Sequence, residues 1–208
     1  MRLSHIWLSR VPDHRSSSSV INDLDNTKKG GELLTYFYCD FRASRSTNSV
    51  EVMRSLLAQL TEQLCAIMMN PEALLDELLK EAETRVETFY NVRELAQYLS
   101  KVAKLCPRKP LVVVDALDEC RELETFLDGL IMCSDNVRMF VTSRPLKNII
   151  QRLLGFPSIS LHQMADELSA DILLHVTREL DLRSRLRTFD IALKNEIRLQ
   201  LCAKADGM

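Results

Sequence analysis

The feature that most limits the fold of this chain is a run of four apolar residues, 111–114 (LVVV), that ends in a cluster of acids. A continuous apolar run of this length, set off by Pro107 before it, is typical of a parallel strand covered on both faces. Three carboxylates, those of Asp115, Asp118 and Glu119, follow at once. The run therefore favours an α/β protein with a parallel strand that is followed by acidic side chains.

The segment before this run predicts one strand and three helices. The turn signal Gly30-Gly31 precedes an aromatic and apolar stretch, residues 33–41, that indicates a buried strand. Asn48 with Glu51, and Asn91 with Glu94, have the spacing of a capping box, which predicts a helix start at each. A further helix is expected from Asn70-Pro71, because proline suits the first helical position.

The rest of the chain continues the alternation. Strands are expected at residues 5–9, 137–142 and 158–161, and helices at 146–154, 166–180 and 184–203. Alternating strands and helices favour a parallel sheet with right-handed crossovers. We predict an α/β fold, a three-layer parallel sheet of about five strands with helices on both faces and a helical C-terminal extension. The expected domains are residues 1–163, the core, and 164–208, the start of a helical subdomain.

Composition narrows the classes of partner. The chain has 208 residues, 46% of them hydrophobic, and a net charge of -2 with no basic block. Nucleic acid is therefore not an expected partner, and no apolar run approaches the length of a membrane span. The six cysteines include no CxxC pair, and the first residues do not resemble a signal peptide. We expect reduced thiols and a cytoplasmic protein.

The acids after the 111–114 run are the strongest candidate for chemistry. Ligands of open α/β sheets bind outside the carboxyl ends of the strands, where a carboxylate can hold Mg²⁺ against a triphosphate. Asp115 is the expected metal ligand, and Glu119 and Asp118 are the expected catalytic acids that orient or activate water. The competing explanation is a strand that ends in a solvated acidic turn. Three acids so close together count against it.

A second candidate follows the strand expected at 137–142. Ser143 and Arg144 come at its end, before Pro145. If this strand lies beside the acidic one, both residues reach the same crevice, and the planar guanidinium of Arg144 suits phosphate oxygens. We predict that Ser143 and Arg144 contact a nucleotide. Alone, an Arg-Pro pair after a strand usually forms only a turn.

These motifs carry a resemblance to a known family. DALDEC after the apolar run, FVTSRP one strand later and TYFYCDFR before both resemble the Walker B, sensor 1 and second-strand motifs of NACHT domains, which belong to the STAND class of P-loop NTPases. The nephrocystin-like NACHT region of repeat-containing proteins is the most similar type, over residues 5–208 or so. The final Asp206-Gly207-Met208 also resembles the family's segment.

The resemblance implies a function for the site. Asp115, Asp118 and Glu119 would take the Mg²⁺ and hydrolysis positions, and Arg144 the sensor position. It also implies Mg²⁺ with ATP or GTP as the ligand, slow turnover, and a scaffold that signals by oligomerising. Protein partners would then be engaged through flanking domains, and a homo-oligomer is expected only in that longer context.

One motif of the family is missing. A phosphate loop of the form GxxxxGK[ST] needs glycines so that backbone N–H groups can surround the phosphates. No glycine precedes Gly30, and residues 10–16 (RVPDHRS) stand where the loop is expected. Arg15-Ser16 is only a weak counterpart of its Lys-Ser/Thr pair.

Two classes of function remain open from the sequence. We expect a NACHT-like nucleotide-binding signalling module with impaired binding and hydrolysis, and whether it is an enzyme stays undecided. The alternative is a degenerate interaction scaffold that uses no nucleotide, or a truncated fragment of a larger STAND protein. A working ATPase with an unconventional loop is the third hypothesis.

Overall fold

The computed structural model describes residues 5–9, 21–26, 31–40, 48–68, 71–72, 76, 91–160 and 165–205. The chain divides into two compact units, Met1–Ile159 and Ser160–Met208. The helix expected from Asn70-Pro71 lies largely outside the described residues, as do residues 10–20 and 206–208.

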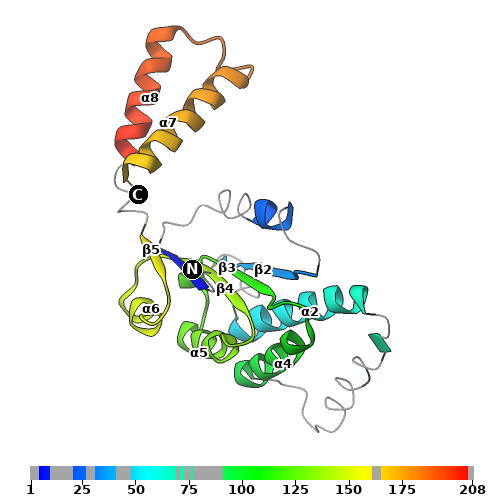
Figure 1. Ribbon diagram of the computed structural model, residues 1–208. Helices are drawn as coiled ribbons and strands as arrows, with labels where there is room; N and C mark the ends of the chain where they lie inside the picture. Colours follow the sequence, from blue (N-terminus) through cyan, green and yellow to red (C-terminus); the bar gives the residue numbers. More distant parts are fainter. Residues whose placement is uncertain are drawn as a thin grey trace. The chain divides into compact units, whose positions relative to one another are not determined.

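A parallel sheet forms the centre of the first unit (Figure 1). Its strands are β1 (His5–Ser9), β2 (Leu34–Tyr38), β3 (Leu111–Asp115), β4 (Arg138–Ser143) and β5 (Ser158–Ser160), in the order β2-β3-β4-β1-β5. The pairs β2/β3, β3/β4 and β1/β4 are parallel. The predicted α/β class with a parallel sheet flanked by helices is confirmed, and the acidic strand is indeed the neighbour of the strand that ends in Ser143.

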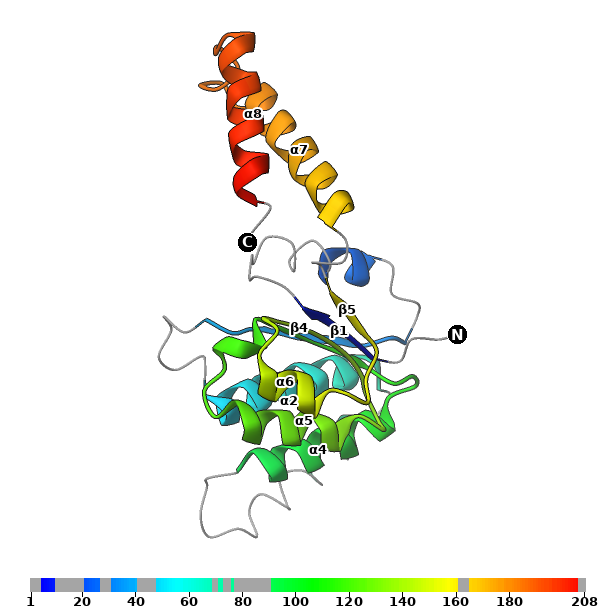
Figure 2. The same cartoon turned by 90° about the vertical axis from the view of Figure 1, so that its left-hand side faces the viewer.

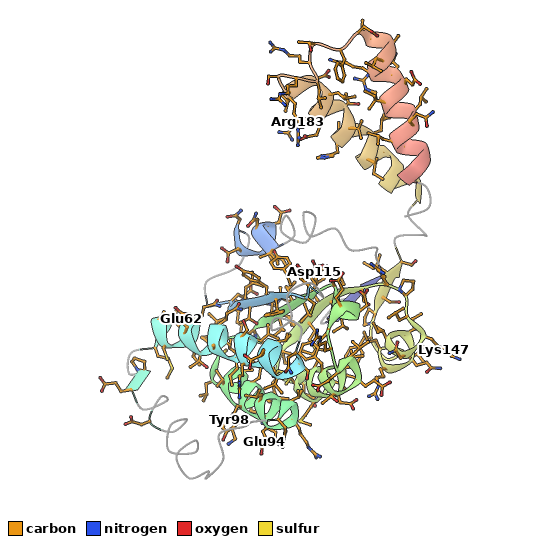
Figure 3. The ribbon with its side chains drawn as sticks, turned by 180° about the vertical axis from the view of Figure 1, so that it is seen from behind. Glu62, Glu94, Tyr98, Asp115, Lys147 and Arg183 are labelled. Carbon is orange, nitrogen blue, oxygen red and sulfur yellow. The ribbon has the colours of Figure 1, made fainter. Side chains whose placement is uncertain are left out.

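Four helices lie on one face of the sheet (Figures 1 and 2). They are α2 (Ser49–Ile67), α4 (Val92–Leu105), α5 (Leu123–Cys133) and α6 (Lys147–Arg152). Their apolar side chains share one core with Val112 and Val114 of β3 and with Met139 and Val141 of β4. Figure 3 shows this layer beneath the strand that carries Asp115.

The opposite face of the sheet is covered by the helical residues 21–26. Ile21 is buried there against Leu34 and Val113, with Leu24 and Phe140 packed alongside. Residues of β3 thus alternate between two cores, since successive side chains of a strand point to opposite faces. This double burial explains the unbroken apolar run that the sequence shows.

Side-chain caps begin two of the helices. At α4 the predicted capping box is present, with the Asn91 side chain accepting from the Glu94 N–H and the Glu94 carboxylate accepting from the Asn91 N–H. At α2 the Asn48 side chain accepts instead from the Val50 N–H, at 2.9 Å. The carboxylate of Glu51 accepts from Arg54, so the reciprocal box expected there was wrong.

The helix α5 was not predicted, and it forms the crossover from β3 to β4. Gly129 lies at the point where α5 crosses α4 and α2. A Cβ atom at this position would lie 2.7 Å from Cγ1 of Val92 and 3.1 Å from Cε of Met53. The glycine therefore allows the helices to pack closely, and this requirement does not show in the apolar pattern.

The second unit contains two helices, α7 (Ala165–Leu182) and α8 (Ile191–Ala205). The prediction that the last helix starts at residue 184 was wrong by seven residues, since α8 starts at Ile191. Asp190 sets this start, because its side chain accepts from the Leu193 N–H at 2.8 Å. Among the described residues, no helix is both long enough and apolar enough to cross a membrane.

Candidate functional site

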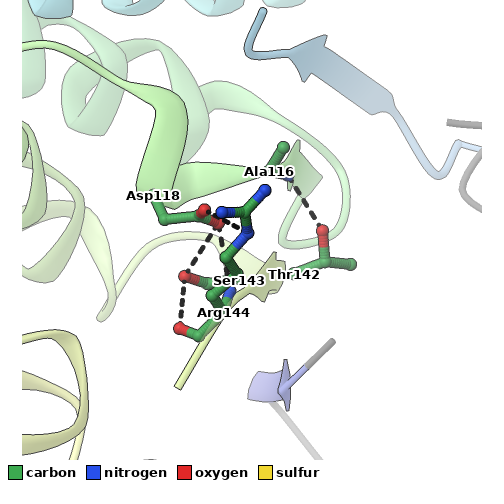
Figure 4. A network of polar contacts seen from close by, with 5 residues as sticks. All are labelled: Ala116, Asp118, Thr142, Ser143 and Arg144. Atoms are coloured by element: carbon green, nitrogen blue, oxygen red, sulfur yellow. Dashed lines mark hydrogen bonds and ion pairs between the residues drawn. The ribbon is translucent and has the colours of Figure 1, made fainter. Parts of the chain in front are cut away.

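The carboxyl ends of β3 and β4 bring the predicted site residues to one edge of the sheet. Figure 4 shows Asp118, Ser143 and Arg144 among them. Val114 pairs with Val141, so Asp115 follows on one strand while Thr142 and Ser143 follow on the other. All five sequence-predicted residues therefore lie on these two strand ends or in the short 3-10 helix η1 (Leu117–Glu119).

Asp115 is 2% exposed and is held by Thr142. The hydroxyl of Thr142 donates to Oδ1 of Asp115 and accepts from the N–H of Ala116 at 3.0 Å. Ala116 has a left-handed conformation, with φ 54°, at the point where the chain leaves the strand. The threonine thus fixes both the carboxylate and the turn behind it. We did not anticipate Thr142, although a polar residue so near the end of a buried strand was a usable signal.

Asp118 joins η1 to the end of β4. One of its oxygens, Oδ1, accepts from the Arg144 N–H at 3.0 Å and from Oγ of Ser143 at 3.3 Å. The other, Oδ2, lies 3.4 Å from Nε of Arg144, whose side chain is 54% exposed while that of Asp118 is 5% exposed. Asp118, Ser143 and Arg144 are therefore brought together, with Asp118 already engaged by both of the others (Figure 4).

The two glutamates of the loop differ in their surroundings. Glu119 is half-buried at the end of η1, where its N–H donates to the Ala116 carbonyl at 2.9 Å. Glu122 has a left-handed conformation, with φ 53°, and accepts from Oγ of Ser49, the buried first residue of α2. This bond ties the start of α2 to the acidic loop. Sequence reasoning missed it, since no local pattern relates Ser49 to Glu122.

The thiols of Cys39 and Cys120 lie close to the carboxylates of Asp115 and Glu119. Cys39 follows β2, and its N–H donates to the Asp115 carbonyl at 3.0 Å. A hydrogen bond with Cys120 and then burial raise the pKa of the Cys39 thiol far above its usual range, and the charges of Asp115 and Glu119 act in the same direction. Cys120 is also buried, as expected for a small apolar filler. All six cysteines of the chain are free.

The carboxylates suit a hard cation only in part. In the part of the chain that the structure describes, no group of three or more His, Cys, Asp and Glu side chains could hold a metal. Mg²⁺, however, is commonly bound through one or two carboxylates while water and substrate phosphates supply its other ligands. Both carboxylates are engaged in the structure, that of Asp115 by Thr142 and that of Asp118 by Arg144 and Ser143.

The strand register places the end of β1 beside the end of β4. Ser9, the last residue of β1, pairs with Ser143. The end of β1 therefore lies next to the end of β4, at the edge that carries the acids. Residues 10–20, which include Arg15 and Ser16, lie outside the described residues. The position is the point where chain connections diverge, which is where open α/β sheets bind ligands.

Comparison with known proteins supports a family assignment. Residues 16–144 match the family described as nephrocystin 3, N-terminal. The chain is also 22% identical over 211 aligned residues to the vegetative incompatibility protein HET-E-1 of Podospora anserina. That alignment covers 97% of this chain but 15% of the relative, so the chain spans only a small part of that protein. Since the family match covers more than half of its length, the chain belongs to the nephrocystin 3 N-terminal family.

Proposed function

We propose that the chain is a NACHT-like nucleotide-binding module of a STAND signalling protein, with impaired binding and hydrolysis. One observation carries the proposal: the acids after β3 and the Ser143-Arg144 pair after β4 meet at the carboxyl edge of a parallel sheet. The family match and the distant relationship to HET-E-1 are consistent with it.

Four of the five predicted residues have a distinct role in this proposal. Asp115, held by Thr142, would bind Mg²⁺ of a Mg-ATP or Mg-GTP complex, and the ion would neutralise phosphate charge. Glu119 would orient the attacking water, because its carboxylate lies on the loop beside Asp115. Asp118 would act mainly on Arg144, which must exchange its contact with Asp118 for a phosphate oxygen.

The charge balance argues for weak binding. Asp115, Asp118, Glu119 and Glu122 all lie at or near the edge, and the Arg144 guanidinium is already paired with Asp118. A triphosphate adds negative charge to this group, and the sequence before Gly30 offers no glycine-rich loop to oppose it. Nucleotide affinity should therefore be low.

A thermal-shift titration tests nucleotide binding. Mg-ATP, Mg-ADP and Mg-GTP are added to the parent protein and to the Asp115→Ala variant. A ligand that binds only the native state at about 100 times its Kd raises stability by about 2.7 kcal/mol. We expect a shift only at high nucleotide concentration, and none in the variant. Equal shifts in both proteins, or no shift in either, would remove the proposed site.

Phosphate release at saturating Mg-ATP tests hydrolysis, with Glu119→Gln as the matched control. We expect no more than trace turnover, because losing even one preorganised donor costs about a hundredfold to a thousandfold in rate. Steady turnover that disappears in the control would show that residues 10–19 form a phosphate site of another kind.

The alternative function is an interaction scaffold that uses no nucleotide. The observation in its favour is that Arg144, Ser143 and Asp118 satisfy one another without a ligand. Under either function, protein partners, a homo-oligomer in a longer protein and a cytoplasmic location remain proposals.

A further inference from the structure

The outer edge of β2 is the feature that the proposed function does not use. β2 stands at one end of the strand order, beside β3 alone. In a strand, alternate residues direct their backbone groups to opposite sides. The Leu33 carbonyl accepts from Leu111, and the Cys39 N–H donates to Asp115, so the odd-numbered residues face β3. The backbone groups of Leu34 and Tyr36 therefore face outward.

Two glutamines of α2 bind these outward groups. The Tyr36 N–H donates to Oε1 of Gln59 at 3.0 Å, and Nε2 of Gln59 donates to the Tyr36 carbonyl at 2.9 Å. Gln63 repeats the pattern with Leu34, accepting at 3.3 Å and donating at 2.8 Å. Each side-chain amide thus makes the donor and acceptor bonds that a neighbouring strand would make.

The spacing of the two elements makes this match repeat. Gln59 and Gln63 are four residues apart, which is about 6.0 Å along a helix. Leu34 and Tyr36 are two residues apart, which is about 6.6 Å along a strand. The first glutamine binds the later strand residue, so α2 runs antiparallel to β2. The spacing of the two glutamines along α2 therefore matches the spacing of the outward backbone groups along β2.

The remaining amide hydrogens are also used. Nε2 of Gln59 lies 3.2 Å from Oγ of Ser55, and Nε2 of Gln63 lies 3.2 Å from the Gln59 carbonyl. Each amide is thereby bonded on both sides, to the helix and to the strand. A fixed amide can take the place of a strand, whereas a freely rotating one cannot.

We propose that Gln59 and Gln63 close the β2 edge against pairing with the β2 edge of a second copy of this chain. Residues 33–39 (LLTYFYC) contain no charge and no proline, and such a strand is a ready template for edge pairing. Tyr36 is 42% exposed, and its ring packs on Tyr38 with centroids 5.7 Å apart. Every copy of the chain has the same β2 edge, so the edge of a second copy is the partner against which the glutamines act.

The test uses the full chain with Gln59→Leu and Gln63→Leu combined, and each alone in case the double variant does not fold. Glu62→Leu is the matched control, because it adds the same side chain at an exposed position of α2 (Figure 3). Amide hydrogen exchange at Leu34 and Tyr36 reports on the edge. Analytical ultracentrifugation over a concentration series reports on association.

At concentrations that keep the variants monomeric, we expect exchange at these two amides to rise at least about tenfold in the glutamine variants. At higher concentrations we expect self-association that the parent and Glu62→Leu do not show at equal concentration. Adding Tyr36→Lys should reverse the association, because a lysine on an edge strand opposes pairing. Unchanged exchange would overturn the closure. Faster exchange without association, or association that Tyr36→Lys leaves intact, would overturn the pairing.

Discussion

The helical layer and the carboxyl edge of the same sheet are both buried, but different forces hold them. In the layer, Leu60, Leu99 and Phe126 are fully buried among apolar side chains. At the edge, Asp115 and Asp118 are nearly as buried and are held by directed bonds from β4. Close packing of apolar side chains stabilises the layer, whereas hydrogen bonds and an ion pair of defined geometry stabilise the edge.

The residues that stabilise this fold are therefore largely separate from the residues of the candidate site. Apolar burial contributes about 25 cal/mol for each Å² removed from water. Burial of one large side chain in the layer therefore stabilises the fold by more than a single hydrogen bond does. A hydrogen bond contributes only about 1 kcal/mol net. Changes in the layer should therefore unfold the protein, whereas changes at the edge should alter the site and leave the fold.

The largest effect is expected at Phe126, which lies in α5. Phe126→Ala should lower the free energy of unfolding by about 3–5 kcal/mol, because it leaves a cavity in a close-packed core. Urea titration measures this, with Phe126→Leu as the milder control. A loss below that of the control would mean that the layer rearranges around the gap.

Gly129 tests the close packing of the helices. Gly129→Ala should cost about 2 kcal/mol, since overpacking typically costs about 1–3 kcal/mol and exceeds the gain in helix propensity. The stiff side chain of Val92 leaves the new Cβ atom little room. In the same titration, Gly129→Ala should cost less in a Val92→Ala background than in the parent, because the shorter side chain leaves room for the new Cβ atom. A stabilised Gly129→Ala variant would contradict the packing at this crossing.

Asp118 tests the edge through its contacts with β4. Asp118→Ala should cost about 1–2 kcal/mol, because it removes the acceptor of the Arg144 N–H and of the Ser143 hydroxyl. The control Arg144→Ala removes only the exposed guanidinium and should cost under about 1 kcal/mol in the same assay. Equal losses would mean that the ion pair, and not the backbone bond, joins the loop to β4.

Asp115 should show the smallest effect on stability. Asp115→Asn keeps an oxygen that can accept from Thr142, so the free energy of unfolding should stay within about 1 kcal/mol of the parent, while Mg-nucleotide binding is lost. Chemical denaturation checks the first part and the thermal-shift titration the second. A loss of several kcal/mol would identify the carboxylate as a structural partner and remove its assignment to a metal.

The sequence predicted more of the fold than of the site's internal arrangement. The apolar run before Asp115 and the box at Asn91 gave the strand and the helix start directly, because both patterns are local. The helix α5 was missed although it lies between two predicted strands. Its first residues after the acidic loop carry no capping side chain, since Glu122 precedes it in a left-handed conformation.

The sequence alone supports the α/β class, a strand followed by three acids, and the absence of a glycine-rich loop before Gly30. Which side chains contact one another depends on the packing of the whole domain. Thr142 binds a carboxylate 27 residues earlier, Glu122 binds a serine 73 residues earlier, and Gln59 binds a strand 23 residues earlier. A strand or helix follows from the residue pattern along a few turns or pleats. These bonds depend on strand order and register, which the packing of the whole sheet against its helices determines.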